Sequence, residues 1–599
     1  MIRVRPPTVL LAAALCLFVM ASANASIMGE ELSNNEEMLT RGGAGDGSSR
    51  LLQRRRKQIH QRRLQDIELN GHSQTLCRSI IAVGGMRILH EAQDLAPLDD
   101  DDEYTNIDSN GDVLLSYNEI QDEIVETDEE FVCEIDDETT VPIQGTEEQM
   151  SELRALLNRG YFVSYEDTLN VAPIGNAVGE SSLVGKLEAG ASTEVVSLSP
   201  GPIKVIKSNA NNNGRRLQGR SKYEGVKKAL VIRVTDRKGK QPNEKAPFLS
   251  DKFFGTYGDK VTLASGYKAC TFGKITFTNN YGNAIDTKKL TAPGVLDVTI
   301  NGALDALTQS QMRGEVISAA SSKLGVELSE TFDHVLIVIE KCYRSGGESC
   351  SWAAYAYVNH WLSVYQQQNY KFPGVTMHEV GHNLNLAHSG GKDGRTYTDH
   401  TCIMGNPLWQ DDVGAMCFNP VKNYQVAKAG NSWYESRHIV SFNSGTTIRK
   451  SWRGKLIGVA EYNNNPHNHA ISVKLETGKE SDWFFGFNRA TGANADVVMG
   501  GDQVTIYQVY AGDGFSYSHS NLKANINQGQ RVKITDWRGS GYALFIKVHE
   551  INTHSSPGYA DVEITFDGEA IPNPTPSPTP NPTPNPTSNP TPNPTPNPT

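Results

Sequence analysis

The chain has 599 residues, of which 38% are hydrophobic and 21% are charged. These values are near the norm for globular proteins, and they exclude a wholly disordered chain and a collagen-like repeat. The net charge of −12 is uneven, because residues 91–138 hold 20 Asp and Glu and no Lys or Arg, so the rest sums to about +8. The acidity belongs to one segment, and nothing here indicates a nucleic-acid binder.

Residues 1–25 have the pattern of a secretory signal peptide. Arg3 and Arg5 precede an apolar run at residues 9–21, and small residues suited to cleavage follow. A signal-anchor is the alternative interpretation. No later apolar stretch approaches the roughly 18 residues that a membrane span needs. We therefore expect a soluble, secreted protein with no membrane span in its mature form.

Residues 26–216 have the composition of a propeptide. They combine a basic run at residues 54–57, the acidic block, and an Asn/Gly-rich stretch that ends in Arg215 and Arg216. A dibasic pair after such a stretch, just before the first strong strand pattern, predicts proteolytic processing there. A solvated surface turn is the alternative for each Arg pair.

The acidic block contains a candidate calcium loop at residues 108–119. Oxygen side chains stand at the EF-hand ligand positions, namely Asp108, Asn110, Asp112, Ser116 and Glu119. Val113 replaces the usual turn Gly, but residues 117–124 have a helical apolar pattern. Calcium binding and a solvated acidic hinge are both open at this point.

Three further segments follow. In residues 222–440, strand patterns at 229–234, 274–277 and 335–340 alternate with a helical pattern around 309–324, which predicts an α/β domain. Residues 445–568 contain at least seven short strand patterns without a convincing helix, which predicts a β-sandwich or β-barrel. Residues 572–599 hold 13 of the 28 Pro, which predicts an extended polyproline II tail. The tail could tether the protein to a cell wall or matrix, or it could be a passive linker.

The residues that carry chemistry are His378-Glu379-Val380-Gly381-His382, followed by His388. Positions i and i+4 of a helix share one face, so His378 and His382 can bind one metal ion beside Glu379. His388 as a third ligand would leave one coordination position open for water, as in catalytic zinc sites. Zinc lowers the pKa of such a water, and Glu379 can accept its proton.

These residues, with Met404 in Cys402-Ile403-Met404-Gly405, resemble the metzincin metallopeptidases. Asn385 stands where the metzincin pattern has Gly. That Gly takes a left-handed conformation at the helix end, which Asn tolerates best among the other residues. The position two residues after Met404 lacks the Tyr of astacin-like and serralysin-like enzymes.

The closer resemblance is to the gametolysin family. It rests on residues 267–274, on the zinc helix HEVGHNLNLAHSGG, on residues 402–405 and 417–419, and on residues 486–492. The resemblance implies a zinc endopeptidase that acts on extracellular matrix or cell-wall proteins rich in Pro or hydroxyproline. It implies His378, His382 and His388 as ligands, Glu379 as the base and Met404 as the Met-turn. It also implies a zymogen, but no typical thiol-latch motif surrounds Cys77 or Cys133.

Seven cysteines remain after Cys16 of the signal peptide. Spacing suggests short-loop disulfides Cys342–Cys350 and Cys402–Cys417, and the odd count leaves at least one thiol unpaired. The aromatic residues Tyr355, Tyr357 and Trp361 could line a substrate cleft or pack in the core.

The sequence as a whole predicts a secreted zinc endopeptidase with a β-rich C-terminal domain. The alternative from another class is a matrix-binding or adhesion protein with a degenerate peptidase domain.

Overall fold

The structure is a computed structural model. Its continuously described regions are residues 107–116, 224–341, 352–411, 416–429, 451–477, 481–510 and 518–566. Short strands are described outside them: β1 (Thr75–Cys77), β2 (Ser79–Arg87), β4 (Glu130–Glu134), β5 (Thr140–Gln144), β6 (Leu169–Val171), β7 (Val196–Ser197) and β15 (Ile439–Asn443). The predicted signal peptide, processing site, proline-rich tail and Cys342–Cys350 pair lie outside the described residues.

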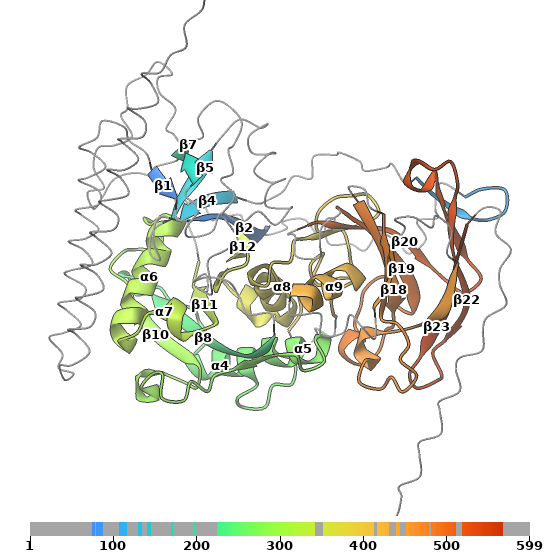
Figure 1. Cartoon of the computed structure of the whole chain (residues 1–599). Helices are drawn as coiled ribbons and strands as arrows, with labels where there is room; N and C mark the ends of the chain where they lie inside the picture. The colour runs from blue at the N-terminus through green and yellow to red at the C-terminus, as the bar shows by residue number, and fades with distance from the viewer. Residues whose placement is uncertain are drawn as a thin grey trace, which may run out of the picture. The chain divides into compact units, whose positions relative to one another are not determined.

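A mixed sheet forms the centre of the α/β region (Figure 1). Its strands here are β8 (Gly225–Thr235), β9 (Ile275–Thr278), β10 (Val295–Thr299), β11 (His334–Ile339), β12 (Trp352–Tyr357) and β13 (Leu362–Gln366). Strands β10, β8, β11 and β13 are parallel in that order, and β12 runs antiparallel to β13. Strand β11 is buried along its whole length, as parallel strands covered on both faces require.

Helices cover both faces of this sheet. They are α4 (Ala246–Phe254), α5 (Leu263–Cys270), α6 (Gln309–Leu324), α7 (Leu328–Thr331) and α8 (Pro373–Asn383), with short 3-10 turns at η1 (Thr287–Lys289) and η2 (Asn369–Lys371). Helix α9 (Pro420–Ala429) packs instead against strands between residues 472 and 510. Helix α6 begins with a capping box between Thr308 and Gln311 and ends at Gly325 with φ 80°. One face packs against α6, and the other packs against α4, α5 and α8. The predicted α/β arrangement, including the helix at 309–324, is confirmed.

The N-terminal segment adds strands to this sheet. Strand β2 pairs antiparallel with β12, and β4, β5 and β7 follow outward. Strand β2 also contacts helix α8. Strand β12 is therefore covered along its outer edge by residues that precede the α/β region.

Two further sheets form the C-terminal sandwich, which we define as residues 451–566. Its strands are β16 (Trp452–Ile457), β17 (Ser472–Glu476), β18 (Ser481–Asn488), β19 (Gln503–Tyr510), β20 (Ser520–Ile526), β21 (Arg531–Thr535), β22 (Leu544–Asn552) and β23 (Tyr559–Phe566), with 3-10 turns η3 (Val459–Glu461), η4 (Gly492–Asn494) and η5 (Trp537–Gly539). Side chains of both sheets share one core around Trp483, Ile506 and Val548. In the described part of the chain the two sheets stay separate, so this region is a sandwich rather than a closed barrel.

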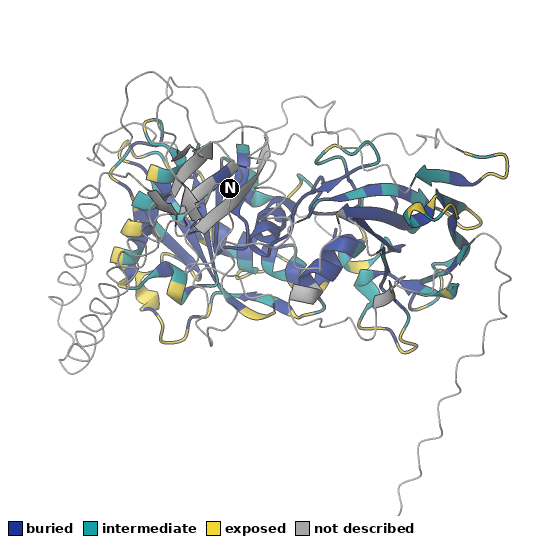
Figure 2. Ribbon diagram, turned by 45° about the horizontal axis from the view of Figure 1, so that its top comes forward, coloured by how far each residue is buried: buried dark blue, intermediate teal, exposed yellow. Residues whose placement is uncertain are grey.

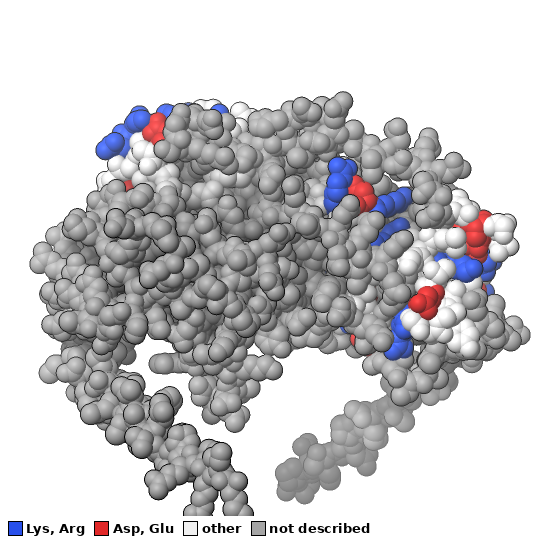
Figure 3. All heavy atoms as spheres, turned by 90° about the horizontal axis from the view of Figure 1, so that it is seen from above, with Lys and Arg blue, Asp and Glu red and all other residues white. Residues whose placement is uncertain are grey.

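Buried residues and charged residues lie in different places in the described part of the chain. Figure 2 shows buried residues concentrated in the sheets and in α8, with exposed residues at loops and outer helix faces. On the face shown in Figure 3, the described Lys and Arg side chains lie among Asp and Glu rather than in a patch of one sign. None of the helices in the described regions is both long and apolar enough to span a membrane.

Candidate active site

Helix α8 places the first two candidate ligands. Its Pro at the first turn suits a helix start, and His378 and His382 stand one turn apart with ring centroids 4.9 Å from each other. The buried Tyr267 hydroxyl donates a 2.8 Å hydrogen bond to the Met377 carbonyl, and the Asn383 amide donates to the Tyr357 and Leu362 carbonyls at 2.8 and 2.9 Å. The helix is thereby fixed to α5 and to the sheet.

The chain turns sharply after this helix. Asn385 has φ 63°, as predicted for the residue that replaces the metzincin Gly. The Asn385 N–H donates to the His382 carbonyl at 2.8 Å, and the Leu386 N–H donates to the Gly381 carbonyl at 3.0 Å. This left-handed helix end brings His388 back toward the two histidines of α8.

The three predicted ligands converge. One side-chain nitrogen from each of His378, His382 and His388 lies within 4.8 Å of the others, and all three residues are fully buried. Among the His, Cys, Asp and Glu side chains in the described ranges, these three histidines are the group close enough together to hold a metal ion.

The chemistry of these rings fits zinc. The Nδ1 atoms of His378 and His382 lie 2.7 and 2.8 Å from the carbonyls of Ile403 and Leu386. A carbonyl only accepts, so each Nδ1 carries the proton and each Nε2 keeps its lone pair for a metal. Burial lowers the pKa of His378 to about 4 and holds the pKa values of His382 and His388 well below the usual range. The rings are neutral, which is the state that binds metal ions.

Glu379 lies next to the cluster and is fully buried. Both its carboxylate oxygens lack a hydrogen-bond partner among the described residues, and burial raises the pKa of this carboxyl well above its ordinary value. A buried carboxyl without donors is costly unless a cation or water is nearby. The orphaned oxygens and the orphaned Nε2 of His378 therefore fit a metal ion with an attendant water.

Met404 packs beneath the helix as predicted for a Met-turn. It is fully buried, and a Cβ added to Gly381 would lie 2.3 Å from the Met404 sulfur. Gly381 thus allows the helix and the Met-turn to approach each other closely. The Met404 carbonyl accepts a 2.8 Å hydrogen bond from the Ser389 N–H, which links the Met-turn to the residue after His388.

Comparison with known proteins identifies this region. Residues 245–444 match the family model described as Gametolysin peptidase M11. This region is similar to the gametolysin peptidases. The matched residues include all three histidines, Glu379 and Met404.

Other similarities are weak. No curated protein matches the chain. Wild-type OgpA from Akkermansia muciniphila is 12% identical, with 61% of this chain and 100% of that chain covered and a TM-score of 0.23. Catalytically inactive OgpA in complex with an O-glycopeptide (glycodrosocin) substrate is 10% identical, with 60% and 96% covered and a TM-score of 0.23.

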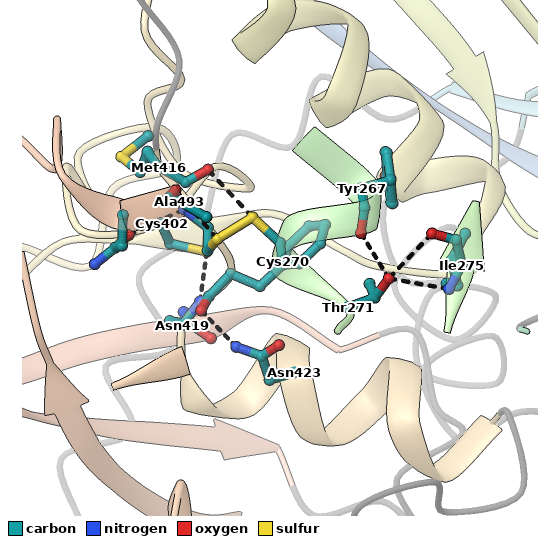
Figure 4. Close-up of a disulfide and its surroundings, with 12 residues drawn as sticks. Tyr267, Cys270, Thr271, Ile275, Cys402, Met416, Asn419, Asn423 and Ala493 are labelled. Carbon is teal, nitrogen blue, oxygen red and sulfur yellow. Dashed lines mark hydrogen bonds between the residues drawn. A yellow bond between two sulfur atoms is a disulfide. The ribbon is translucent and has the colours of Figure 1, made fainter. Parts of the chain in front are cut away.

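A disulfide joins two segments of the gametolysin domain that lie 147 residues apart. Cys270 at the end of α5 pairs with Cys417 (Figure 4). The predicted Cys402–Cys417 pair is therefore wrong. Cys402 is a free, buried thiol whose sulfur accepts hydrogen bonds from the Met404 and Asn419 N–H groups at 3.4 and 3.3 Å. Burial raises its pKa to about 12, so it is unreactive.

Tyr397 is a site residue that the sequence analysis missed. Its hydroxyl lies 3.1 Å from Nε2 of His388, and its ring centroid is 4.5 Å from that of His388. It has φ 67°, a strained value for a bulky residue and one that is common at functional sites. No local motif marks Tyr397, because only the fold brings it to the metal ligands.

The three aromatic residues that could have lined a substrate cleft lie away from the histidine cluster. Tyr355, Tyr357 and Trp361 are buried in the hydrophobic core on the α6 side of the sheet, so core packing is the correct alternative for them.

The candidate calcium loop is described only up to Ser116. Residues 113–116 form β3 (Val113–Ser116), which pairs parallel with β21 of the sandwich. Asp108 Oδ1 accepts from the N–H groups of Asn110 and Asp112, and both Asp112 oxygens accept from the Arg531 guanidinium. Glu119 and the predicted outgoing helix lie outside the described residues. Calcium binding stays a prediction, in competition with this ion pair.

Proposed function

We propose that the chain is a secreted zinc-dependent endopeptidase. The observation that carries this proposal is the convergence of three buried, neutral histidines beside a buried carboxyl that has no hydrogen-bond partner in the described regions. The match of residues 245–444 to the gametolysin peptidase model supports the same reaction class.

In amide hydrolysis the histidines and Glu379 would have separate roles. His378, His382 and His388 would hold zinc, which when bound polarises the scissile carbonyl and lowers the pKa of a water molecule. Glu379 would accept the proton of the attacking water and later deliver it to the leaving amine. The raised pKa of Glu379 suits a group that must hold a proton between these two steps.

The substrate class that we propose is extracellular matrix or cell-wall protein. The signal-like N-terminus and the proline-rich tail support an extracellular location, and the gametolysin resemblance supports matrix proteins rich in Pro or hydroxyproline. Cleavage specificity can be obtained by profiling on a peptide library.

Hydrolysis of a generic protein substrate tests the proposal. We expect purified, processed protein to cleave casein, to lose this activity with a zinc chelator, and to regain it when zinc is restored. An absence of chelator-sensitive turnover would favour the alternative, a matrix-binding protein with a degenerate peptidase domain.

We further propose that residues 26–216 form an inhibitory propeptide removed by cleavage at Arg215–Arg216. Strand β2 supports this, because it pairs along β12, with Gly84 opposite Ala356 and Gly85 opposite Tyr355. Without β2, strand β12 would be an open sheet edge beside α8, and such edges bind extended peptides. The N-terminal segment would thus occupy a place that substrate could use.

Two measurements test the propeptide. N-terminal sequencing of secreted active protein should find a start near residue 217. The double substitution Arg215→Ala with Arg216→Ala should yield an uncut protein with much lower activity. Full activity in a protein that still begins near Ala25 would exclude an inhibitory propeptide.

A further inference from the structure

The segment that follows the third histidine pairs with a strand of the C-terminal sandwich. Strand β14 (Ser389–Gly390) pairs parallel with the start of β20, with Ser389 opposite Ser520 and Gly390 opposite Asn521. The Ser520 N–H donates to the carbonyl of His388 at 3.3 Å. The backbone of the third ligand is therefore bonded to a strand more than a hundred residues further along the chain.

A buried polar cluster reinforces this junction. It consists of Ser389, Asp399, Asn419 and Ser520, each at most 3% exposed. The Ser389 hydroxyl lies 2.6 Å from an Asp399 oxygen and 2.9 Å from the Ser520 hydroxyl. The Asn419 amide donates to the hydroxyls of Ser389 and Ser520 at 2.9 and 3.2 Å. We call these four residues the Ser389 cluster.

The four residues of the Ser389 cluster come from four different segments of the chain. Ser389 follows the third ligand, Asp399 precedes the Met-turn, and Asn419 immediately precedes helix α9 and lies beside the disulfide (Figure 4). Ser520 comes from the sandwich. Polar groups without access to water are stable only when their hydrogen bonds are made, so the cluster holds these segments in one arrangement.

Two more contacts hold β14 and helix α9 close to the start of β20. A Cβ on Gly390 would lie 2.6 Å from the Asn521 side-chain oxygen and 2.9 Å from the Arg395 carbonyl, so β14 and β20 lie unusually close. The buried Lys422 of α9 donates a 2.7 Å hydrogen bond to the Ser518 carbonyl, just before β20 begins. The His519 ring, between these residues, lies 5.7 Å from that of His388.

We infer that the C-terminal sandwich is part of the metal centre and that the Ser389 cluster positions His388 for metal binding. This inference rests on the proposed function, in which His388 is a zinc ligand. His378 and His382 lie on one helix, but His388 lies in a loop whose position depends on contacts with other segments. Strand β20 supplies that support through Ser520, which makes Ser520 and Ser389 positioning residues.

Zinc affinity of the full chain tests this inference. Ser520→Ala removes the hydroxyl that Ser389 and Asn419 share, and Ser520→Cys keeps the side-chain size while weakening the hydrogen bonds. Gly390→Ala adds a Cβ that would clash with the Asn521 side chain of β20 and with the Arg395 carbonyl, so β14 must shift. Each should weaken zinc binding about 10- to 100-fold, as loss of groups that orient metal ligands typically does. Competition with a chromophoric zinc chelator measures the dissociation constant.

Ser472→Ala is the matched control. Ser472 is fully buried at the start of β17 in the same sheet, and its hydroxyl has no hydrogen-bond partner among the described residues. It should bind zinc like the wild type. If Ser520→Cys and Gly390→Ala also bind zinc as tightly as this control, the positioning role is wrong.

Kinetics at saturating zinc separate positioning from direct substrate contact. A misplaced His388 should lower kcat with little change in KM, whereas loss of a substrate contact should raise KM. A predominant rise in KM would overturn the inference. The zinc dissociation constant is measured without catalysis. A wild-type protein that binds zinc but cleaves no substrate would therefore refute the proposed function, while the inference about His388 could still be tested.

Discussion

The two sides of the proposed metal centre are built in different ways. His378 and His382 are placed by one turn of α8, so five consecutive residues determine their spacing. His388 is placed by the left-handed turn at Asn385, the Met-turn and strand β20. Local geometry fixes the first pair, while the third ligand depends on contacts between segments far apart in the sequence. The helix side should therefore tolerate distant changes that the His388 side does not.

The largest effect should follow from removing the disulfide, which belongs to the long-range side. Cys270→Ser with Cys417→Ser frees a loop of 147 residues and should lower the free energy of unfolding by about 2–5 kcal/mol. Urea unfolding measures the change. Cys402→Ser is the control, because it alters a buried thiol without removing a cross-link. A double variant as stable as this control would mean that the bond contributes nothing to the support of the Met-turn.

The pH dependence of the free energy of unfolding tests the contact between His334 and the end of α8. His334 is fully buried, its Nδ1 lies 3.5 Å from the Asn383 side-chain oxygen at the end of α8, and burial lowers its pKa to about 4. Below pH about 6.5 the unfolded chain binds a proton that the folded chain excludes, so stability falls as pH falls toward 4, by at most about 3 kcal/mol.

The comparison of wild type with His334→Gln isolates this contribution. The free energy of unfolding of metal-free protein should fall less steeply between pH 7 and 4 in the variant. Identical slopes would show that His334 takes up its proton equally well in the folded and unfolded states.

The smallest expected effect is on zinc affinity when Asn385, in the turn between α8 and His388, is replaced. Asn385→Gly should retain zinc, because Gly reaches the left-handed region without a Cβ clash. Asn385→Val should weaken zinc binding, since strain of about 1–3 kcal/mol at this position would displace His388. Equal zinc dissociation constants for the two variants would show that the conformation of Asn385 does not govern the third ligand.

The sequence predicted the parts that depend on local pattern. Apolar runs predicted strands within β8, β9 and β11, periodicity predicted α6, and the His spacing predicted the cluster on α8. Strand β20 was missed because its buried positions alternate with half-buried ones and begin with Ser520, so its apolar signal is weak. The pairing of Cys417 was misjudged because sequence proximity does not measure distance in the fold.

The same reason explains the site residues that were missed. Tyr397 and Asp399 have no motif of their own, and Asn419 lies in the 417–419 part of the gametolysin resemblance without a role assigned to it there. Each reaches the metal ligands or their supports through tertiary contacts. The sequence could predict which three histidines would come together, but it could not predict what holds the third one in place.

Zinc content and turnover of Glu379→Ala, measured on the same preparation, test the central claim most directly. In the proposed mechanism the histidines hold the metal and Glu379 transfers the proton, so the variant should bind zinc like the wild type and lose about 10²- to 10⁴-fold in kcat. Glu379→Gln, which keeps the side-chain shape, should behave in the same way. Near-normal turnover with zinc bound in either variant would contradict the account.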